Sequence, residues 1–207
     1  MVARSPNQVR LIAGGWRGRK LDFPPVPGLR PTPDRVRETL FNWLARDVPG
    51  ARCLDLFAGS GALGLEARSR GAAEVILVDR HPQVIAHLHQ QIARLGMDRV
   101  HCHRAEALDW LQRVASPCDV VFVDPPFADQ AWDAVLAALA RTGAVRSGGK
   151  VYVEAPRGRS LGVPPGWTLW REGRAGEIAF RVFITSPATD APVTGNAAGE
   201  ISDARLR

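Results

Sequence analysis

The run Asp124-Pro125-Pro126-Phe127 combines residue types that could hold an amino group of a nucleobase and prepare it for reaction. It directly follows the apolar run 120–123, which is typical of a buried strand. The Asp124 carboxylate and the Pro125 carbonyl can both accept hydrogen bonds from an exocyclic amine, and the prolines restrict the backbone that carries them. Phe127 offers a flat face on which a base can stack. A plain turn after a strand is the alternative interpretation.

A second candidate site lies upstream, in the glycine-rich segment 55–64. It follows a short apolar strand and opens a helical pattern, and Gly59, Gly61 and Gly64 permit a tight turn and the close approach of a ligand. Asp79 ends the next expected strand, twenty residues after Gly59. A carboxylate at that place suits the hydroxyls of an adenosine ribose. The segment therefore predicts a site for a nucleoside cofactor.

Two details favour S-adenosylmethionine over NAD, although the glycine pattern fits both. Asp55 precedes the glycines, where its charge would repel a pyrophosphate but attract the cationic methionine end of S-adenosylmethionine. Nicotinamide chemistry also does not require the strand that ends in Asp124-Pro125-Pro126-Phe127.

Together, the runs 55–61 and 124–127 resemble the S-adenosylmethionine-dependent amino-methyltransferases of the Rossmann type. The runs 10–21 and 29–44 narrow the resemblance to the RsmD family, which methylates N2 of a guanine in bacterial 16S ribosomal RNA. The likeness extends from about residue 8 to about residue 184. The chain departs from the family at two positions. It has His81 where the family often has an acid, and Glu106 where Asp or Asn is common.

The resemblance implies roles for individual residues. The expected catalytic residues are Asp124, Pro125, Pro126 and Phe127, and the expected cofactor-binding residues are Thr32, Arg37, Asp55, Phe57, Gly59, Gly61, Asp79 and Glu106. Asp55 and the glycines would face the methionine part, Asp79 the ribose and Glu106 the adenine. Thr32 and Arg37 would close over the site, with helix capping and a solvated helix face as their alternatives.

The expected reaction is direct displacement at the sulfonium methyl group. Hydrogen bonds from guanine N2 to Asp124 and to the Pro125 carbonyl would localise the lone pair of the amine and aim it at the methyl group. The base would have to be unpaired or flipped out of its helix. An ordinary carboxyl pKa makes Asp124 a weak base, so release of the proton to Asp124 and release to water both stay open.

Charge is concentrated near the N-terminus. Residues 1–50 carry a net charge of +5, whereas the whole chain of 207 residues carries +6. A basic segment beside a nearly neutral domain is typical of contact with a phosphate backbone, although a diffusely basic surface is the alternative. The expected RNA contacts are Arg10, Trp16, Arg17, Arg19 and Lys20. The implied partner is 16S ribosomal RNA in the small subunit or in an assembly intermediate.

Apolar runs and helical patterns alternate along the chain and predict an α/β fold, with helices on both faces of a mostly parallel sheet. Strands are expected near 52–57, 74–79, 99–103, 119–123 and 149–154, and helices near 62–70, 82–95, 106–115 and 130–141. The resemblance adds an antiparallel pair near 167–172 and 177–184, which completes a seven-stranded, doubly wound, Rossmann-like methyltransferase sheet.

The segment before the first βα unit is expected to form a hairpin from 9–13 and 19–23, followed by a helix that starts at Pro33 and is capped by Thr32. The expected domains are a basic N-terminal hairpin extension and connector over 1–31, a methyltransferase domain over 32–185 and a disordered tail over 186–207.

Composition argues for a single cytoplasmic domain, since the chain carries neither a membrane-spanning apolar stretch nor a signal peptide. The three cysteines lack metal-like spacing, so no metal site is expected. The protein is expected to be a monomer. Three other functions stay open. They are an amino-methyltransferase acting on DNA or another RNA, an NAD-dependent oxidoreductase, and a non-catalytic RNA-binding protein.

Overall fold

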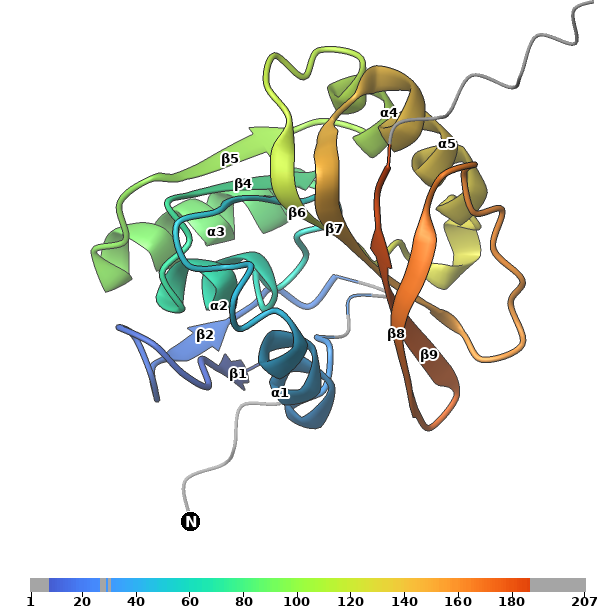
Figure 1. The fold of residues 1–207 in the computed structure, drawn as a ribbon. Coiled ribbons are helices and arrows are strands. Elements are labelled where there is room, and N and C mark those ends of the chain that lie inside the picture. The colour runs from blue at the N-terminus through green and yellow to red at the C-terminus, as the bar shows by residue number, and fades with distance from the viewer. Residues whose placement is uncertain (1–7, 27–28, 30, 187–207) are drawn as a thin grey trace, which may run out of the picture.

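The computed structural model describes residues 8–26, 29 and 31–186, which form a large sheet, a small hairpin and surrounding helices (Figure 1). The strands of the large sheet are β3 (Arg52–Asp55), β4 (Glu74–Asp79), β5 (Val100–Arg104), β6 (Cys118–Val123), β7 (Val145–Pro156), β8 (Thr168–Ala175) and β9 (Ile178–Ile184). The helices are α1 (Asp34–Trp43), α2 (Gly64–Ser69), α3 (Pro82–Leu95), α4 (Ala107–Leu111) and α5 (Trp132–Thr142), with a 3-10 turn η1 (Phe127–Asp129). The hairpin pairs β1 (Gln8–Arg10) with β2 (Lys20–Asp22).

The seven strands of the large sheet lie in the order β5-β4-β3-β6-β7-β9-β8. Neighbours from β5 to β7 are parallel, and β9 runs antiparallel to both β7 and β8. This arrangement confirms the predicted doubly wound sheet with an antiparallel pair at one edge. The chain leaves β3 toward β4 on one side and returns to β6 on the other. The carboxyl ends of β3 and β6 therefore border the switch point where open α/β sheets bind ligands.

Alternate residues of the central strands point into two different cores, because successive side chains of a strand face opposite sides of the sheet. Cys53 and Val120 belong to the core that packs against the hairpin, α1, α2 and α3. Leu54 and Val121 belong to the core under α4 and α5. Both faces of the sheet are thus covered, as a parallel sheet requires (Figure 1).

The N-terminal hairpin packs on the domain through buried apolar side chains. Val9, Leu11 and Leu21 are buried in the core that also contains α1 and α3 residues. At the turn of the hairpin, Gly14 has a φ of +82°, and a Cβ at this position would lie 1.7 Å from the carbonyl oxygen of Ser69 on α2. The turn therefore approaches α2 so closely that it requires glycine. The predicted hairpin is confirmed, and its turn packs directly against α2.

Several element boundaries differ from those expected. Helix α1 begins at Asp34 after Pro33, and no side chain caps it, so the capping role expected for Thr32 is wrong. Helix α4 is shorter than the predicted helix 106–115, and β7 is longer than the predicted strand 149–154. After Ser186 the expected tail lies outside the described residues, and the domain boundaries stay predictions. Among the helices of the described part, none has both the length and the apolarity to span a membrane.

Gly14→Ala should loosen the hairpin, because a methyl group at this position collides with the α2 backbone and also disfavours the left-handed conformation. We expect the free energy of unfolding in urea to fall by about 2–4 kcal/mol, and the amides of Ile12 and Ala13 to exchange hydrogen faster. Gly15→Ala is the matched control, since a Cβ there meets nothing within 4 Å. Equal losses from both variants would contradict this account of the turn.

Candidate active site

A cavity of about 860 Å³ lies at the carboxyl ends of the central parallel strands. Ten of the residues predicted from the sequence line it, namely Thr32, Asp55, Phe57, Gly59, Asp79, Glu106, Asp124, Pro125, Pro126 and Phe127. Gly61 and Arg37 are not among the lining residues. Gly61 instead has a φ of +77° and leaves no room for a side chain beside Leu65 and Leu88. The sheet edge thus brings the glycine-rich segment and the Asp124 run into one space.

Asp79, at the end of β4, organises the glycine-rich loop. Its two carboxylate oxygens accept main-chain hydrogen bonds from Gly59 N at 3.0 Å and from His81 N at 2.8 Å. Gly59 itself has a φ of +50°, a conformation that favours glycine. Each carboxylate oxygen retains a further lone pair, so Asp79 can hold the loop and still accept hydrogen bonds from ligand hydroxyls.

Asp55, at the end of β3, is almost fully buried, with 1% of its surface exposed. Its Oδ2 accepts a hydrogen bond from Gly64 N at 3.0 Å, while its Oδ1 is buried and has no hydrogen-bond partner among the described residues. Burial raises the pKa of Asp55 to about 7, although the main-chain amides of Gly64 and Phe57 act in the opposite direction. A buried acceptor without a partner, on the wall of a cavity, suits a cationic ligand.

Gly64 allows this arrangement because α2 starts directly above β4. A Cβ at Gly64 would lie 2.2 Å from a Leu77 methyl carbon and 3.3 Å from Asp55 Oδ2. Only glycine lets the helix lie this close to the strand and donate its amide to the carboxylate.

Arg80 is a cavity residue that the sequence analysis did not single out. Its guanidinium lies 3.1 Å from Asp129 and 3.9 Å from Glu106, so it joins the turn after β6 to the loop after β5. The Glu106 side chain is more than half exposed and points its charge at this guanidinium. Arg80 could have been suspected, because it directly follows the strand-ending Asp79.

Asp124 directly follows β6 and lines the same cavity. The Thr32 hydroxyl donates to Asp124 Oδ2 at 3.5 Å, so Thr32 contributes to the site rather than to the α1 terminus. Burial, followed by the charges of Glu154 and Asp55, raises the pKa of Asp124 well above its usual range. The expectation of an ordinary, weakly basic carboxyl is therefore wrong, since sequence alone does not show how many carboxyls share one cavity.

Glu154 is the acid that the sequence analysis missed. It lines the cavity, has only 6% of its surface exposed and accepts a 2.8 Å hydrogen bond from the Tyr152 hydroxyl at Oε2. Burial raises the pKa of Glu154, whereas the hydroxyls of Tyr152 and Thr32 lower it. One signal could have found this residue. It ends the predicted strand 149–154, so the rule that gathers Asp55 and Asp124 at one edge applies to it as well.

Phe127 presents its ring at the mouth of the cavity. With 47% of its surface exposed, it is one of the few large apolar side chains of the described residues that are open to solvent. One side of the ring packs at a tilt against buried Trp132, with centroids 6.0 Å apart. Much of the ring is therefore exposed beside the cavity, and the stacking role expected for it stays a prediction.

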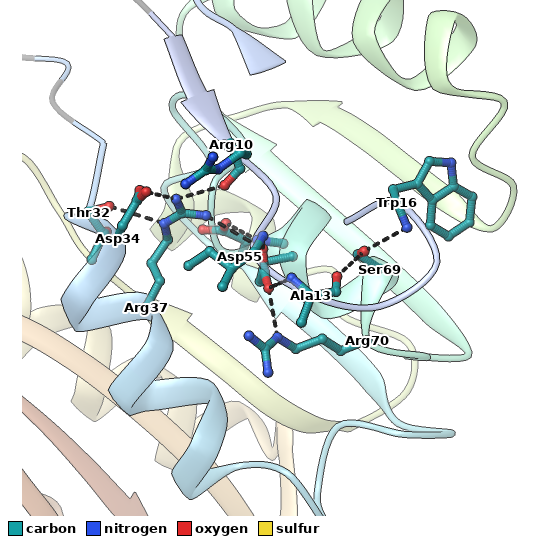
Figure 2. Close-up of polar contacts among 12 residues, drawn as sticks. Arg10, Ala13, Trp16, Thr32, Asp34, Arg37, Asp55, Ser69 and Arg70 are labelled. Atoms are coloured by element: carbon teal, nitrogen blue, oxygen red, sulfur yellow. Dashed lines mark hydrogen bonds and ion pairs between the residues drawn. The ribbon is translucent and has the colours of Figure 1, made fainter. Parts of the chain in front are cut away.

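Arg37 does not face solvent, so the alternative of a solvated helix face is wrong. Its guanidinium is fully buried, and Figure 2 shows it extending from α1 toward Arg10 of the hairpin. It donates to the carbonyl oxygens of Thr32 at 3.2 Å and Arg10 at 2.9 Å, and to Asp34 at 2.6 Å. Arg37 thus contacts the main chain beside the cavity rather than the cavity itself.

The charge of Arg37 is balanced by Glu66, a fully buried carboxylate on α2. The two side chains are 3.6 Å apart at Arg37 Nη1 and Glu66 Oε2. Glu66 also accepts hydrogen bonds from Ile12 N at 2.7 Å, from Ala13 N at 3.1 Å and from Arg70 Nε at 2.7 Å. This buried network (Figure 2) joins the hairpin, α1 and α2.

The residues predicted to contact RNA divide into two groups. The first group, Arg10, Arg17, Arg19 and Lys20, is exposed on the hairpin. The ring of Trp16 instead packs back on the domain, where its indole N–H donates to Leu95 O at 2.8 Å and Arg68 lies 5.5 Å from the ring centroid. The structure therefore gives Trp16 a role in fixing the hairpin.

Taken together, a doubly wound sheet, a glycine-rich loop between two carboxylates and an Asp-Pro-Pro-Phe turn at the switch point define a Rossmann-like methyltransferase. Comparison with known proteins agrees with this class. The family model described as "Conserved hypothetical protein 95" matches residues 9–184. The chain belongs to this family, the RsmD family of methyltransferases.

Curated relatives carry a more specific name. "Ribosomal RNA small subunit methyltransferase D" of Escherichia coli (strain K12) is 45% identical over 178 residues, which cover 86% of this chain and 90% of the relative. The protein of the same name from Haemophilus influenzae is 37% identical over 187 residues, which cover 87% of this chain and 97% of the relative. A solved Escherichia coli structure, provisionally described as a methyltransferase, has a TM-score of 0.80 at 40% identity and covers 86% of this chain and 98% of that chain.

Arg37→Met should destabilise the protein, because it leaves the Glu66 carboxylate buried with one cation fewer and removes donors from two carbonyl groups. We expect a loss of about 3–5 kcal/mol in the free energy of unfolding in urea. The exposed Arg35 on the same helix provides the matched variant Arg35→Met, which should change stability by no more than about 0.5 kcal/mol. An Arg37→Met protein with normal stability but no cofactor binding would instead support the direct contact expected from the sequence.

Proposed function

We propose that the protein transfers a methyl group from S-adenosylmethionine to the exocyclic N2 of a guanine in bacterial small-subunit ribosomal RNA. The observation that carries the proposal is the presence of Asp124 and the Pro125 turn in the same cavity as Asp55 and the glycine-rich loop. Donor and acceptor of the methyl group can then meet without any movement of the sheet. The name carried by the curated relatives supports the choice of ribosomal RNA as substrate.

The residues around the cavity fit S-adenosylmethionine by their chemistry. When bound, this cofactor supplies a methyl group on a positively charged sulfur. The unpartnered Oδ1 of Asp55 suits the cationic methionine end, and Asp79 has lone pairs available for ribose hydroxyls. Glu106 and Arg80 border the remaining part, where the adenine would lie. An NAD pyrophosphate would instead be repelled by Asp55.

In the proposed mechanism Asp124 and the Pro125 carbonyl accept hydrogen bonds from the two N–H groups of guanine N2. This contact localises the lone pair on N2 and directs it along the axis of the bond to be broken. N2 gains the methyl group, and the bonding electron pair leaves with sulfur. When ionised, Asp124 can accept the proton that N2 then loses, and its raised pKa makes this ionised form a stronger base. Phe127 supports the base by stacking.

The exposed cations of the hairpin provide a surface for the RNA backbone. Arg10, Arg17, Arg19 and Lys20 form a sequence-independent contact of the kind that weakens as salt rises. The hairpin is held against α2 by Glu66 and Ser69, so this surface has a fixed place relative to the cavity. A substrate within the small subunit or an assembly intermediate would place the activity in the cytoplasm.

Binding of S-adenosylmethionine should depend on pH through Asp55. Its pKa of about 7 means that half of the unliganded protein carries a neutral Asp55 at that pH, and a cation prefers the ionised form. Binding therefore releases a proton. The dissociation constant should be nearly constant above about pH 8 and should rise by up to tenfold per unit below about pH 7.

Titration calorimetry across this range, in buffers of different ionisation enthalpy, measures both the affinity and the released proton. Asp55→Asn should weaken binding and reduce its pH dependence, whereas Asp109→Asn on the exposed side of α4 should do neither. An affinity that is flat between about pH 6 and about pH 8 would contradict the role of Asp55.

The reaction itself is tested by transfer of labelled methyl from S-adenosylmethionine to small ribosomal subunits that lack the modification. Wild type should yield N2-methylguanosine, identified by mass spectrometry of the digested RNA. Asp124→Ala should lower the rate by about a hundredfold to a thousandfold and leave the dissociation constant for S-adenosylmethionine within a few-fold of wild type. Asp109→Asn again serves as the control.

Three results would count against the proposal. If the wild-type protein binds S-adenosylmethionine but labels no ribosomal substrate, the proposed substrate is wrong, and DNA or another RNA would be tested next. RNA binding without any methyl transfer would support a non-catalytic RNA-binding protein. A protein that does not bind S-adenosylmethionine would exclude the proposed reaction.

A further inference from the structure

Glu154 is a nearly buried acid of the cavity that the transfer step does not require. It belongs to the wall that carries Asp124, since the Thr32 hydroxyl lies 3.5 Å from Asp124 and also stabilises the charged form of Glu154. Its charge in turn raises the pKa of Asp124. Both carboxyls thus line the cavity that the acceptor base would enter, and the charge of Glu154 acts on Asp124.

The position of Glu154 is fixed from two directions. The Trp132 indole donates to its main-chain oxygen at 2.7 Å, and the Tyr152 hydroxyl donates to its Oε2 at 2.8 Å. Both donors are buried, and Trp132 is also the ring against which Phe127 packs. The elements that would hold the base and the carboxyl of Glu154 therefore form one rigid unit. A carboxyl held in this way is suited to reading a ligand, because little entropy is lost when it forms a further hydrogen bond.

We propose that Glu154 accepts a hydrogen bond from N1–H of the target guanine and thereby makes the site selective for guanine among bases with an exocyclic amine. The inference rests on the proposed function and names the group that selects its substrate. On the Watson–Crick edge of guanine, N1–H and the N2 amine are adjacent donors, which match the two adjacent acids Asp124 and Glu154. Adenine and cytosine instead present a lone pair on the ring nitrogen next to their amine.

The energetic consequence is a penalty for the wrong base. With Glu154 ionised, a ring-nitrogen lone pair would face a carboxylate in a place from which water is largely excluded, and the ring nitrogen would have no hydrogen-bond donor. Sites built around such a hydrogen bond reject analogues that lack it by large factors. Asp124 and the proline turn can orient any exocyclic amine, so Glu154 supplies the distinction that they lack.

The test compares guanine with 2-aminopurine at the methylated position of ribosomal RNA reconstituted into small subunits. Both bases carry the 2-amino group, but N1 of 2-aminopurine is an acceptor. We expect wild type to prefer guanine by about a hundredfold or more in kcat/KM. In Glu154→Gln the amide can donate to N1 of 2-aminopurine, so activity on guanine should fall by about tenfold to a hundredfold and the preference should narrow at least tenfold.

The deciding quantity is the change in the ratio between the two substrates, because 2-aminopurine also lacks O6. Asp124→Asn should slow both substrates and keep the ratio, and Glu38→Gln, on the exposed side of α1, should change neither rate nor ratio. Retained binding of S-adenosylmethionine shows that Glu154→Gln is folded. The preference of the wild-type enzyme for guanine over 2-aminopurine can be measured without any variant.

Two results would overturn the inference while leaving the proposed function intact. One is a wild-type enzyme that methylates guanine and 2-aminopurine equally well, and the other is a Glu154→Gln enzyme that keeps the wild-type ratio. If wild type does not methylate guanine N2 at all, the proposed function fails first and the inference fails with it.

Discussion

The buried carboxylate of Glu66 is the interaction on which the arrangement of the site depends. It lies on α2, the helix that the glycine-rich loop opens, and accepts main-chain hydrogen bonds from the hairpin at Ile12 and Ala13. Through Arg37 it also holds the carbonyl of Thr32, whose hydroxyl contacts Asp124. A carboxylate that is shielded from water needs donors of this kind, and removing one of them would leave its charge poorly compensated. The hairpin proposed to bind RNA, the loop proposed to bind the cofactor and the wall that carries Asp124 are therefore connected through this one buried carboxylate.

The sheet and the gathering of acids could be predicted from the sequence for a geometric reason. Apolar strands that alternate with helices form parallel sheets, and the carboxyl ends of parallel strands meet at one edge. Asp55, Asp79 and Asp124 each end such a strand or directly follow one, so their common cavity follows from the order of elements. Glu154 also ends an expected strand, but it is not part of a recognisable motif, so the sequence did not mark it as a site residue.

The surroundings of Arg37 and Thr32 could not be predicted, because the residues that decide them are distant in sequence. On its own helix Arg37 has the appearance of a surface residue, and only the hairpin and Glu66 bury it. A threonine before Pro33 is a typical capping pattern, yet a tertiary contact with Asp124 takes its hydroxyl. Sequence patterns describe the few residues around a position, whereas burial and charge pairing depend on what the fold brings to it.

The acids gathered in one cavity lower the stability of the folded protein, and they also suit the cavity to the ligands proposed for it. Burial raises the pKa of Asp55 from its ordinary value to about 7, so the unfolded chain ionises this group first as pH rises. Stability is therefore lost between about pH 4 and about pH 7, by an amount on the order of 4 kcal/mol for this residue alone. In the proposed function, a cationic cofactor and a base that presents N–H donors would supply charge and hydrogen-bond partners to these carboxyls. The free energy that burial of these carboxyls costs would then be recovered on binding, which favours ligands that carry positive charge or hydrogen-bond donors where these carboxyls lie.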